Sequence, residues 1–102
     1  YDKIIPACPL FFKKHLMKNI EIYTTMFCPF CSRAKKLLNN KGADYKEIDV
    51  TVDGDLREEM TRRAHGAYTV PQIFVDGEHI GDSDMIHMLD AKGTLDHILG
   101  IS

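Results

Sequence analysis

Residues 20–31 read IEIYTTMFCPFC, and the composition of this stretch changes from strand-forming to helix-starting along its length. The first half is rich in isoleucine, tyrosine and threonine, the residue types that favour strands. Pro29 is favoured in the first turn of a helix, because the backbone N–H that proline lacks would have no partner there. Apolar residues then recur at three-to-four spacing, at Ala34, Leu37 and Leu38. The stretch therefore predicts a buried strand that leads directly into a helix.

A second strand and a second helix follow in the same order. Gly42 is typical of the position just beyond a helix end, and residues 44–49 are the second predicted strand. Hydrophobic periodicity then predicts a helix over residues 53–65. Its apolar face carries Leu56, Met60 and Ala64. Because a helix connects them as a crossover, the first two strands should be parallel.

The last third of the chain changes this order. Thr69-Val70-Pro71 leads into a strand at residues 73–75, and Asp76-Gly77 indicates a two-residue hairpin turn into His79-Ile80. Two short helices follow, separated at Gly93. We expect their inward-facing residues to be Met85, Met88 and Leu89 in the first and Leu95, Ile98 and Leu99 in the second. The pattern predicts an α/β fold, with one mixed four-stranded β-sheet flanked by helices on both faces.

Composition excludes several function classes. With 102 residues the chain has the length of one small domain, and its net charge of −2 gives little attraction for nucleic acid or an anionic membrane. No run reaches the roughly 18 to 20 apolar residues of a membrane span. The apolar residues 4–12 precede their lysines, whereas a secretory signal has the positive charge first. We therefore expect a soluble cytoplasmic protein with no nucleic-acid or membrane partner.

Residues 1–18 lack the periodicity of the rest, and Met17 is a candidate native start. We interpret residues 1–18 as a poorly ordered N-terminal leader or extension and residues 19–102 as the folded domain. A short amphipathic helix over residues 10–17 is the alternative. Cys8 falls in this segment, and its role stays open.

The Cys28-Pro29-Phe30-Cys31 motif lies at the head of the first predicted helix. Free backbone N–H groups and the positive end of the helix dipole favour a thiolate at Cys28. Cys28 is therefore the candidate nucleophile. Cys31 lies one turn later, where its sulfur can reach Cys28 and where the helix should bury it more deeply. We expect Cys31 to be the resolving thiol.

Zinc binding and a purely structural disulfide are the competing interpretations of this motif. A structural zinc site needs four ligands and usually a second pair at similar spacing. Cys8 is alone, and the histidines are scattered singly at His15, His65, His79, His87 and His97. A disulfide across residues 28–31 would close a loop too short to restrict the unfolded chain much. We therefore expect a redox pair and no metal site.

Four motifs together resemble the glutaredoxin family, specifically its short dithiol members. In chain order they are Ile22-Tyr23-Thr24, Cys28-Pro29-Phe30-Cys31, Thr69-Val70-Pro71-Gln72-Ile73-Phe74 and Gly81-Asp82-Ser83-Asp84. The first and last alone would be weak signals, but all four in this order and spacing are highly specific. The resemblance covers residues 19–100 and implies a thioredoxin-like fold.

The resemblance also implies a glutathione site beside Cys28. A cis peptide bond is expected at Val70-Pro71, with the Val70 backbone pairing with glutathione as a short added strand. A proline that merely begins an edge strand would fit the same residues. Ser83 and Asp84 would be an ordinary helix N-cap in the simplest interpretation. By resemblance, this helix start also binds the γ-glutamyl carboxylate of glutathione, and Asp84 pairs with its ammonium group.

Phe30 keeps the aromatic wall of the usual tyrosine but lacks its hydroxyl. The residues implied to bind glutathione are Phe30, Arg63, Thr69, Val70, Pro71, Gly81, Ser83 and Asp84.

Three departures from the family pattern predict weaker glutathione binding. Thr25 and Ala67-Tyr68 stand where many relatives have a lysine and an arginine, so two cationic partners for the glycine carboxylate are missing. Arg63 could supply one charge-assisted bond instead, or it could simply pair with Glu59 on the helix surface. Asp82 replaces a glycine, which adds negative charge and removes backbone freedom.

The implied function is that of a glutathione-dependent thiol-disulfide oxidoreductase. Cys28 would reduce protein-glutathione mixed disulfides, and Cys28 with Cys31 would reduce protein disulfides. Glutathione is the implied co-substrate, with no tightly bound cofactor. The implied partners are glutathionylated or disulfide-containing proteins, ribonucleotide reductase being one candidate, and the chain is expected to be a monomer.

Two alternatives stay open. One is an electron carrier linked to thioredoxin reductase, with little use for glutathione. The other is a dimeric module that holds an iron-sulfur cluster through Cys28 of each chain and two glutathione thiolates. Pro29 disfavours the cluster, because cluster-binding relatives more often have a small, flexible residue at that position.

Overall fold

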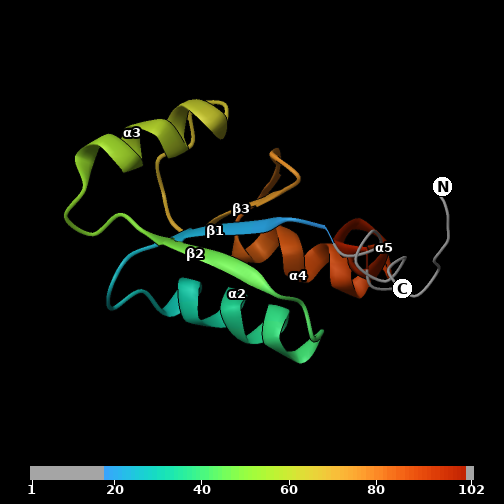
Figure 1. Cartoon of the computed structure of the whole chain (residues 1–102). Helices are drawn as coiled ribbons and strands as arrows, with labels where there is room; N and C mark the ends of the chain where they lie inside the picture. Colours follow the sequence, from blue (N-terminus) through green and yellow to red (C-terminus); the bar gives the residue numbers. More distant parts are fainter. Residues whose placement is uncertain (1–17, 101–102) are drawn as a thin grey trace, which may run out of the picture.

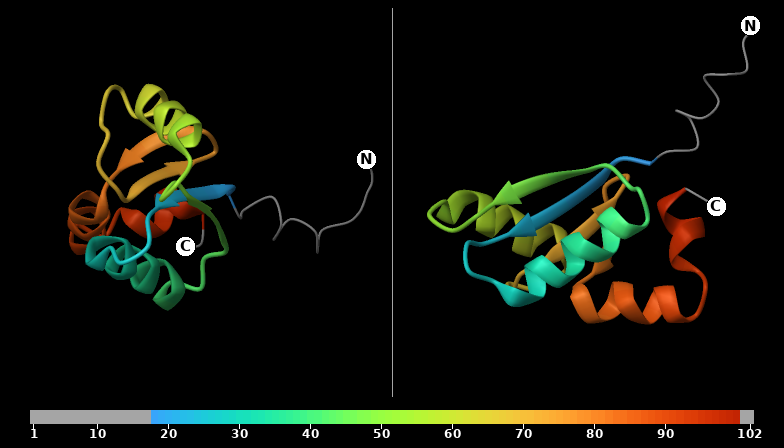
Figure 2. Two further views of the ribbon diagram at one scale, coloured as in Figure 1. Left: turned by 90° about the vertical axis from the view of Figure 1, so that its left-hand side faces the viewer. Right: turned by 90° about the horizontal axis from the view of Figure 1, so that it is seen from below.

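The computed structural model describes residues 18–100 as a mixed sheet between two layers of helices (Figures 1 and 2). The elements in chain order are β1 (Ile20–Thr24), α2 (Pro29–Asn40), β2 (Tyr45–Asp49), α3 (Gly54–Arg63), β3 (Gln72–Val75), β4 (Glu78–Gly81), α4 (Ser83–Ala91) and α5 (Leu95–Leu99). The predicted leader up to Met17, with Cys8 and the alternative helix over residues 10–17, lies outside the described residues. No helix within residues 18–100 is long and apolar enough to cross a membrane.

The sheet has the strand order β2-β1-β3-β4 and confirms the predicted fold class. β1 and β2 are parallel, as the crossover through α2 requires, with Ile20 opposite Tyr45. β3 is antiparallel to both β1 and β4. The turn between β3 and β4 has positive φ at both central residues, 53° at Asp76 and 82° at Gly77, which is typical of the predicted hairpin turn.

Strand alternation divides the apolar residues between two cores on opposite faces of the sheet. The core under α2, α4 and α5 contains Ile20, Ile22, Ala34, Leu38, Ala43, Ile73, Val75, Ile86, Leu95 and Leu99. The core under α3 contains Tyr23, Val50, Met60, Ala64 and Phe74. Figure 1 shows α3 alone on its face and α2 with α4 on the other. The Cys28-Pro29-Phe30-Cys31 motif, at the start of α2, therefore lies on the side of the larger core.

The predicted inward face of α4 was right for Leu89 and wrong for Met85 and Met88. In α4 the side chains of Met85 and Met88 are 39% and 43% exposed, whereas Ile86 is fully buried and Leu89 packs against the core. Four of the five residues 85–89 of this helix are apolar. Its periodicity therefore fits two inward faces, which are rotated from each other by one residue. Packing selects the phase that turns Ile86 and Leu89 inward.

Candidate functional site

Cys28 is the N-cap of α2, so its sulfur lies at the first turn of the helix. Its side chain accepts a hydrogen bond from the backbone N–H of Cys31, with an N···S distance of 3.2 Å. Its Sγ also lies 3.9 Å from the carbonyl oxygen of Val70, which comes two residues before β3. Cys28 is half-buried, and the helix dipole is directed at its sulfur. The geometry leaves this thiol accessible beside Val70.

Cys31 differs from Cys28 in its environment. It is 1% exposed, and burial, followed by the hydrogen bond with Cys28, raises the pKa of its thiol to about 12. Cys31 is therefore protonated at neutral pH, and a protonated, buried thiol is a poor attacking group. It stands one helical turn from Cys28, next to the sulfur it would have to attack after Cys28 has reacted. This asymmetry matches an attacking and a resolving cysteine.

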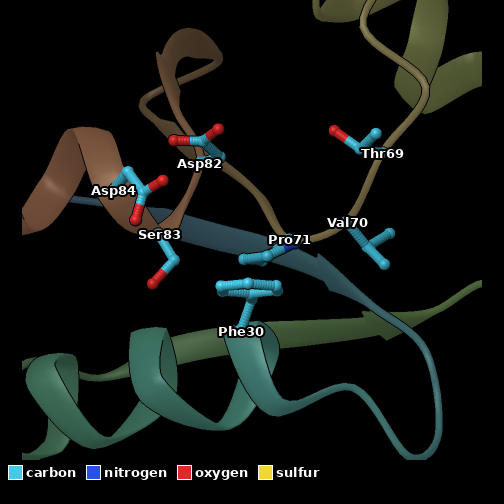
Figure 3. A pocket seen from close by; sticks show the side chains of 7 residues that line it. All are labelled: Phe30, Thr69, Val70, Pro71, Asp82, Ser83 and Asp84. Atoms are coloured by element: carbon cyan, nitrogen blue, oxygen red, sulfur yellow. The ribbon is translucent and has the colours of Figure 1, made fainter.

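A pocket of about 270 Å³ lies between the head of α2, the start of β3 and the start of α4 (Figure 3). Its lining residues are Phe30, Thr69, Val70, Pro71, Asp82, Ser83 and Asp84. The Phe30 ring lies against Pro71, with Thr69 and Val70 on one side and the helix start on the other. The Val70-Pro71 peptide bond is cis, as predicted. Six of the eight residues expected to bind glutathione are thus brought together.

The start of α4 is capped differently from the prediction. Asp82, rather than Ser83 or Asp84, is the N-cap, and its carboxylate accepts from the Met85 N–H at 3.0 Å. Its φ of −103° lies in the extended region, so this position does not require a glycine. Ser83 is buried, whereas the Asp84 side chain is 82% exposed and is 3.9 Å from Arg33. The cap leaves Asp84 available at the pocket rim.

Comparison with known proteins agrees with this geometry. The glutaredoxin family model matches residues 20–80. The chain belongs to the glutaredoxin family. It is 49% identical to glutaredoxin 3 of Escherichia coli (strain K12) over 83 residues, which is 81% of this chain and 99% of that protein.

Two solved structures extend the comparison. The solution structure of glutaredoxin from Brucella melitensis has a TM-score of 0.74 and 44% identity, over 83% of this chain and 91% of that one. A crystal structure of the buckwheat glutaredoxin-glutathione complex has a TM-score of 0.73 and 27% identity, over 86% of this chain and 83% of that one. This glutaredoxin therefore has the thioredoxin-like fold and is a thiol-disulfide oxidoreductase.

Arg63 does not line the pocket of this glutaredoxin. Its guanidinium donates to Glu21 at 2.8 Å and to the Tyr23 hydroxyl at 2.7 Å, and it stacks over the Phe74 ring at 4.3 Å. The alternative pairing with Glu59 is not made either, because Arg63 belongs to this cluster on the α3 face of the sheet. Both terminal nitrogens donate to residues outside the pocket lining, so its contacts do not support the expected role in glutathione binding.

Arg57, which the sequence interpretation missed, contacts the chain just before the pocket. Its Nε and Nη2 donate to the carbonyl oxygen of Tyr68 at 3.2 and 2.8 Å, one residue before the pocket-lining Thr69. In the sequence, only its position next to Leu56 could have indicated that Arg57 lies close to the sheet, because Leu56 packs against the core under α3. Arg57 thus places a positive charge beside the Thr69-Val70 edge.

Gly81, also expected in the site, supports the pocket without lining it. Its φ is 138°, and a Cβ atom there would lie 2.7 Å from the Met85 side chain. Glycine is required for both reasons, since a side chain would displace the first turn of α4.

No three His, Cys, Asp or Glu side chains within residues 18–100 are grouped so that they could hold a metal ion.

Proposed function

We propose that this glutaredoxin reduces protein-glutathione mixed disulfides, with glutathione as its co-substrate. The observation that carries the proposal is the position of Cys28. Its Sγ lies 3.9 Å from the Val70 carbonyl, and Val70 lines the pocket that ends at the head of α4. An extended tripeptide with a central cysteine would reach from Val70 to α4 with its sulfur at Cys28. The buckwheat relative, whose structure is a glutathione complex, supports this choice of ligand.

Each part of glutathione has a partner of complementary chemistry. The cysteinyl backbone pairs with the backbone of Val70 as an added strand. The γ-glutamyl carboxylate accepts from the N–H groups at the start of α4, and Asp84 pairs with the ammonium group. Phe30 and Pro71 form the apolar wall, and Arg57 provides the positive charge for the glycine carboxylate. We propose Arg57 in this role because it is held against Tyr68, next to the pocket-lining Thr69, whereas Arg63 is held by Glu21 and Tyr23.

The catalytic cycle needs only Cys28 for a glutathionylated protein. The Cys28 thiolate attacks the glutathione sulfur of the mixed disulfide, and the target cysteine leaves as a thiolate that takes up a proton. A second glutathione thiolate then attacks the Cys28 adduct. This step releases glutathione disulfide and restores Cys28.

Protein disulfides require both cysteines. Cys28 attacks one sulfur of the target disulfide and forms a mixed disulfide with it, while the target S–S bond breaks and the other target sulfur leaves as a thiolate that takes up a proton. Cys31 then loses its proton and attacks Cys28, which releases the second target thiol and leaves a Cys28-Cys31 disulfide for glutathione to reduce. We propose that the enzyme works in this way as a cytoplasmic monomer, in its domain of residues 19–102. Its targets are disulfide-containing proteins, ribonucleotide reductase being one candidate.

The test compares Cys28→Ser and Cys31→Ser on a glutathionylated peptide and on a protein disulfide. With glutathione, glutathione reductase and NADPH as the coupled system, Cys28→Ser should lose both activities. Cys31→Ser should keep the reduction of the glutathionylated peptide and lose that of the protein disulfide. Activity of the wild type with thioredoxin reductase but not with glutathione would overturn the proposal in favour of the alternative electron carrier.

A further inference from the structure

Gln72 is a buried polar side chain that the mechanism above does not use. It is the first residue of β3, directly after Pro71, and it is 2% exposed. Strand alternation turns it to the same face of the sheet as Phe74, the face that α3 covers. A buried amide needs partners for its two N–H donors and its carbonyl acceptor. The partners that Gln72 has therefore show what it holds in place.

Gln72 connects the pocket edge to β4. Its Nε2 donates to the carbonyl oxygen of Thr69 at 3.0 Å and lies 3.4 Å from the Thr69 hydroxyl. Its Oε1 accepts from Nε2 of His79 at 2.7 Å. Thr69 lines the pocket, is itself exposed, and precedes Val70 in the chain. The Gln72 amide is thus a buried anchor for an otherwise exposed segment.

His79 is held in the orientation that this anchor needs. It stands opposite Phe74 in the β3-β4 register, and its ring lies 5.2 Å from the Phe74 ring and 5.7 Å from that of His65. Burial, followed by the charge of His65, lowers the pKa of His79, and Asp82 opposes this shift. His79 is therefore neutral at neutral pH, with its proton on Nε2 to donate to Gln72. That proton fixes which end of the Gln72 amide faces Thr69.

We propose that Gln72 and His79 are positioning residues, which hold Thr69 and so keep the Val70 edge aligned for glutathione. The inference rests on the proposed function for the identity of the ligand. Neither side chain lines the pocket, and neither contacts Cys28. Their loss should therefore impair binding of the glutathione part of the substrate and leave the thiol chemistry intact.

The test is a set of matched variants assayed with a glutathionylated peptide. Gln72→Met keeps the length and volume of the side chain but removes its hydrogen bonds, so KM should rise about tenfold, with kcat within about twofold of wild type. His79→Phe keeps the ring against Phe74 and removes the donor, so KM should rise less. The double variant should have the same KM as Gln72→Met alone, because His79 acts on Thr69 only through Gln72.

His65→Asn is the matched control. It removes the neighbouring ring of His79 and leaves the bonds of Gln72 in place, and asparagine tolerates the φ of 58° at this position. Its KM should equal that of the wild type at neutral pH. Additive effects of Gln72→Met and His79→Phe, or an unchanged KM in both, would overturn the inference.

An NMR measurement on the ligand-free protein separates this inference from the proposed function. In Gln72→Met the backbone order parameters of Thr69 and Val70 should fall from about 0.85 to below about 0.6, with smaller losses in His79→Phe. If the wild type has no glutathione-dependent activity, the proposed function fails, and the order parameters still decide the inference. Unchanged order parameters in both variants would overturn it, whatever the KM. Should Gln72→Met not fold, His79→Phe provides the same measurement.

Discussion

Asp82 combines two effects that substitutions can separate. Its carboxylate caps α4 through the Met85 N–H at 3.0 Å, and it lines the pocket as a negative charge. Asp82→Ala removes both effects, and loss of such a cap costs about 1 kcal/mol of the free energy of unfolding. For a domain of this size that cost lowers the Tm by about 4–8 °C. Asp82→Asn keeps the cap, because asparagine is an equally good N-cap residue, and removes only the charge.

The same two variants test how the negative charge of Asp82 affects binding in the pocket. Asp82 is exposed, and in water-like surroundings its charge and a ligand carboxylate a few ångströms away repel by about 1 kcal/mol or less, so Asp82→Asn should lower the KM for a glutathionylated peptide about two- to fivefold. Asp84→Asn is the control and should raise the KM, since Asp84 is proposed to pair with an ammonium group. Thermal unfolding and steady-state kinetics measure the two effects. A Tm loss in Asp82→Asn as large as in Asp82→Ala, or a higher KM in Asp82→Asn, would refute this reasoning.

Three further substitutions test individual contacts. Arg63→Met should destabilise the fold by about 2 kcal/mol in urea unfolding, because Glu21 loses a charged hydrogen bond, and should leave the KM for glutathionylated peptide unchanged. Arg57→Met should raise that KM about fivefold, and equal KM values for the two variants would contradict these assignments. Glu47→Gln should cost about 0.5 kcal/mol, because the pair with Lys35 is partly exposed. The hydrogen bond from Lys35, with one from Thr24, lowers the pKa of Glu47 from its ordinary 4.5, so this difference should be present above that pH and disappear as the pH falls through the lowered value. A difference that persists in strong acid would rule out the pair as its source.

The elements that were predicted correctly carry strong local signals. The strand-to-helix change at residues 20–31, the Asp76-Gly77 turn and the Cys-x-x-Cys motif each depend on the conformational preferences of neighbouring residues. The family resemblance then supplied most of the pocket, and Phe30 and Val70 are among the residues that line it.

The errors share one physical cause, which is the phase of a helix. Three consecutive residues at the start of α4 can each act as an N-cap, and only the path of the preceding strand selects Asp82. In the same helix a shift of one residue exchanges Met85 for Ile86 in the core. Arg57 and Arg63 lie six residues apart on α3, so they leave the helix in different directions. Which of them contacts the chain before Thr69 depends on the packing of α3 against the sheet, which no local pattern encodes.

The central claim is that Cys28 attacks the glutathione sulfur of a mixed disulfide held in this pocket. It is tested most directly by incubating Cys31→Ser with one equivalent of a glutathionylated peptide and mapping the products by mass spectrometry. The account predicts one glutathione on Cys28 and a released peptide thiol, because the pocket orients the glutathione half of the disulfide towards Cys28. A peptide adduct on Cys28, or glutathione found only on Cys8, would contradict it.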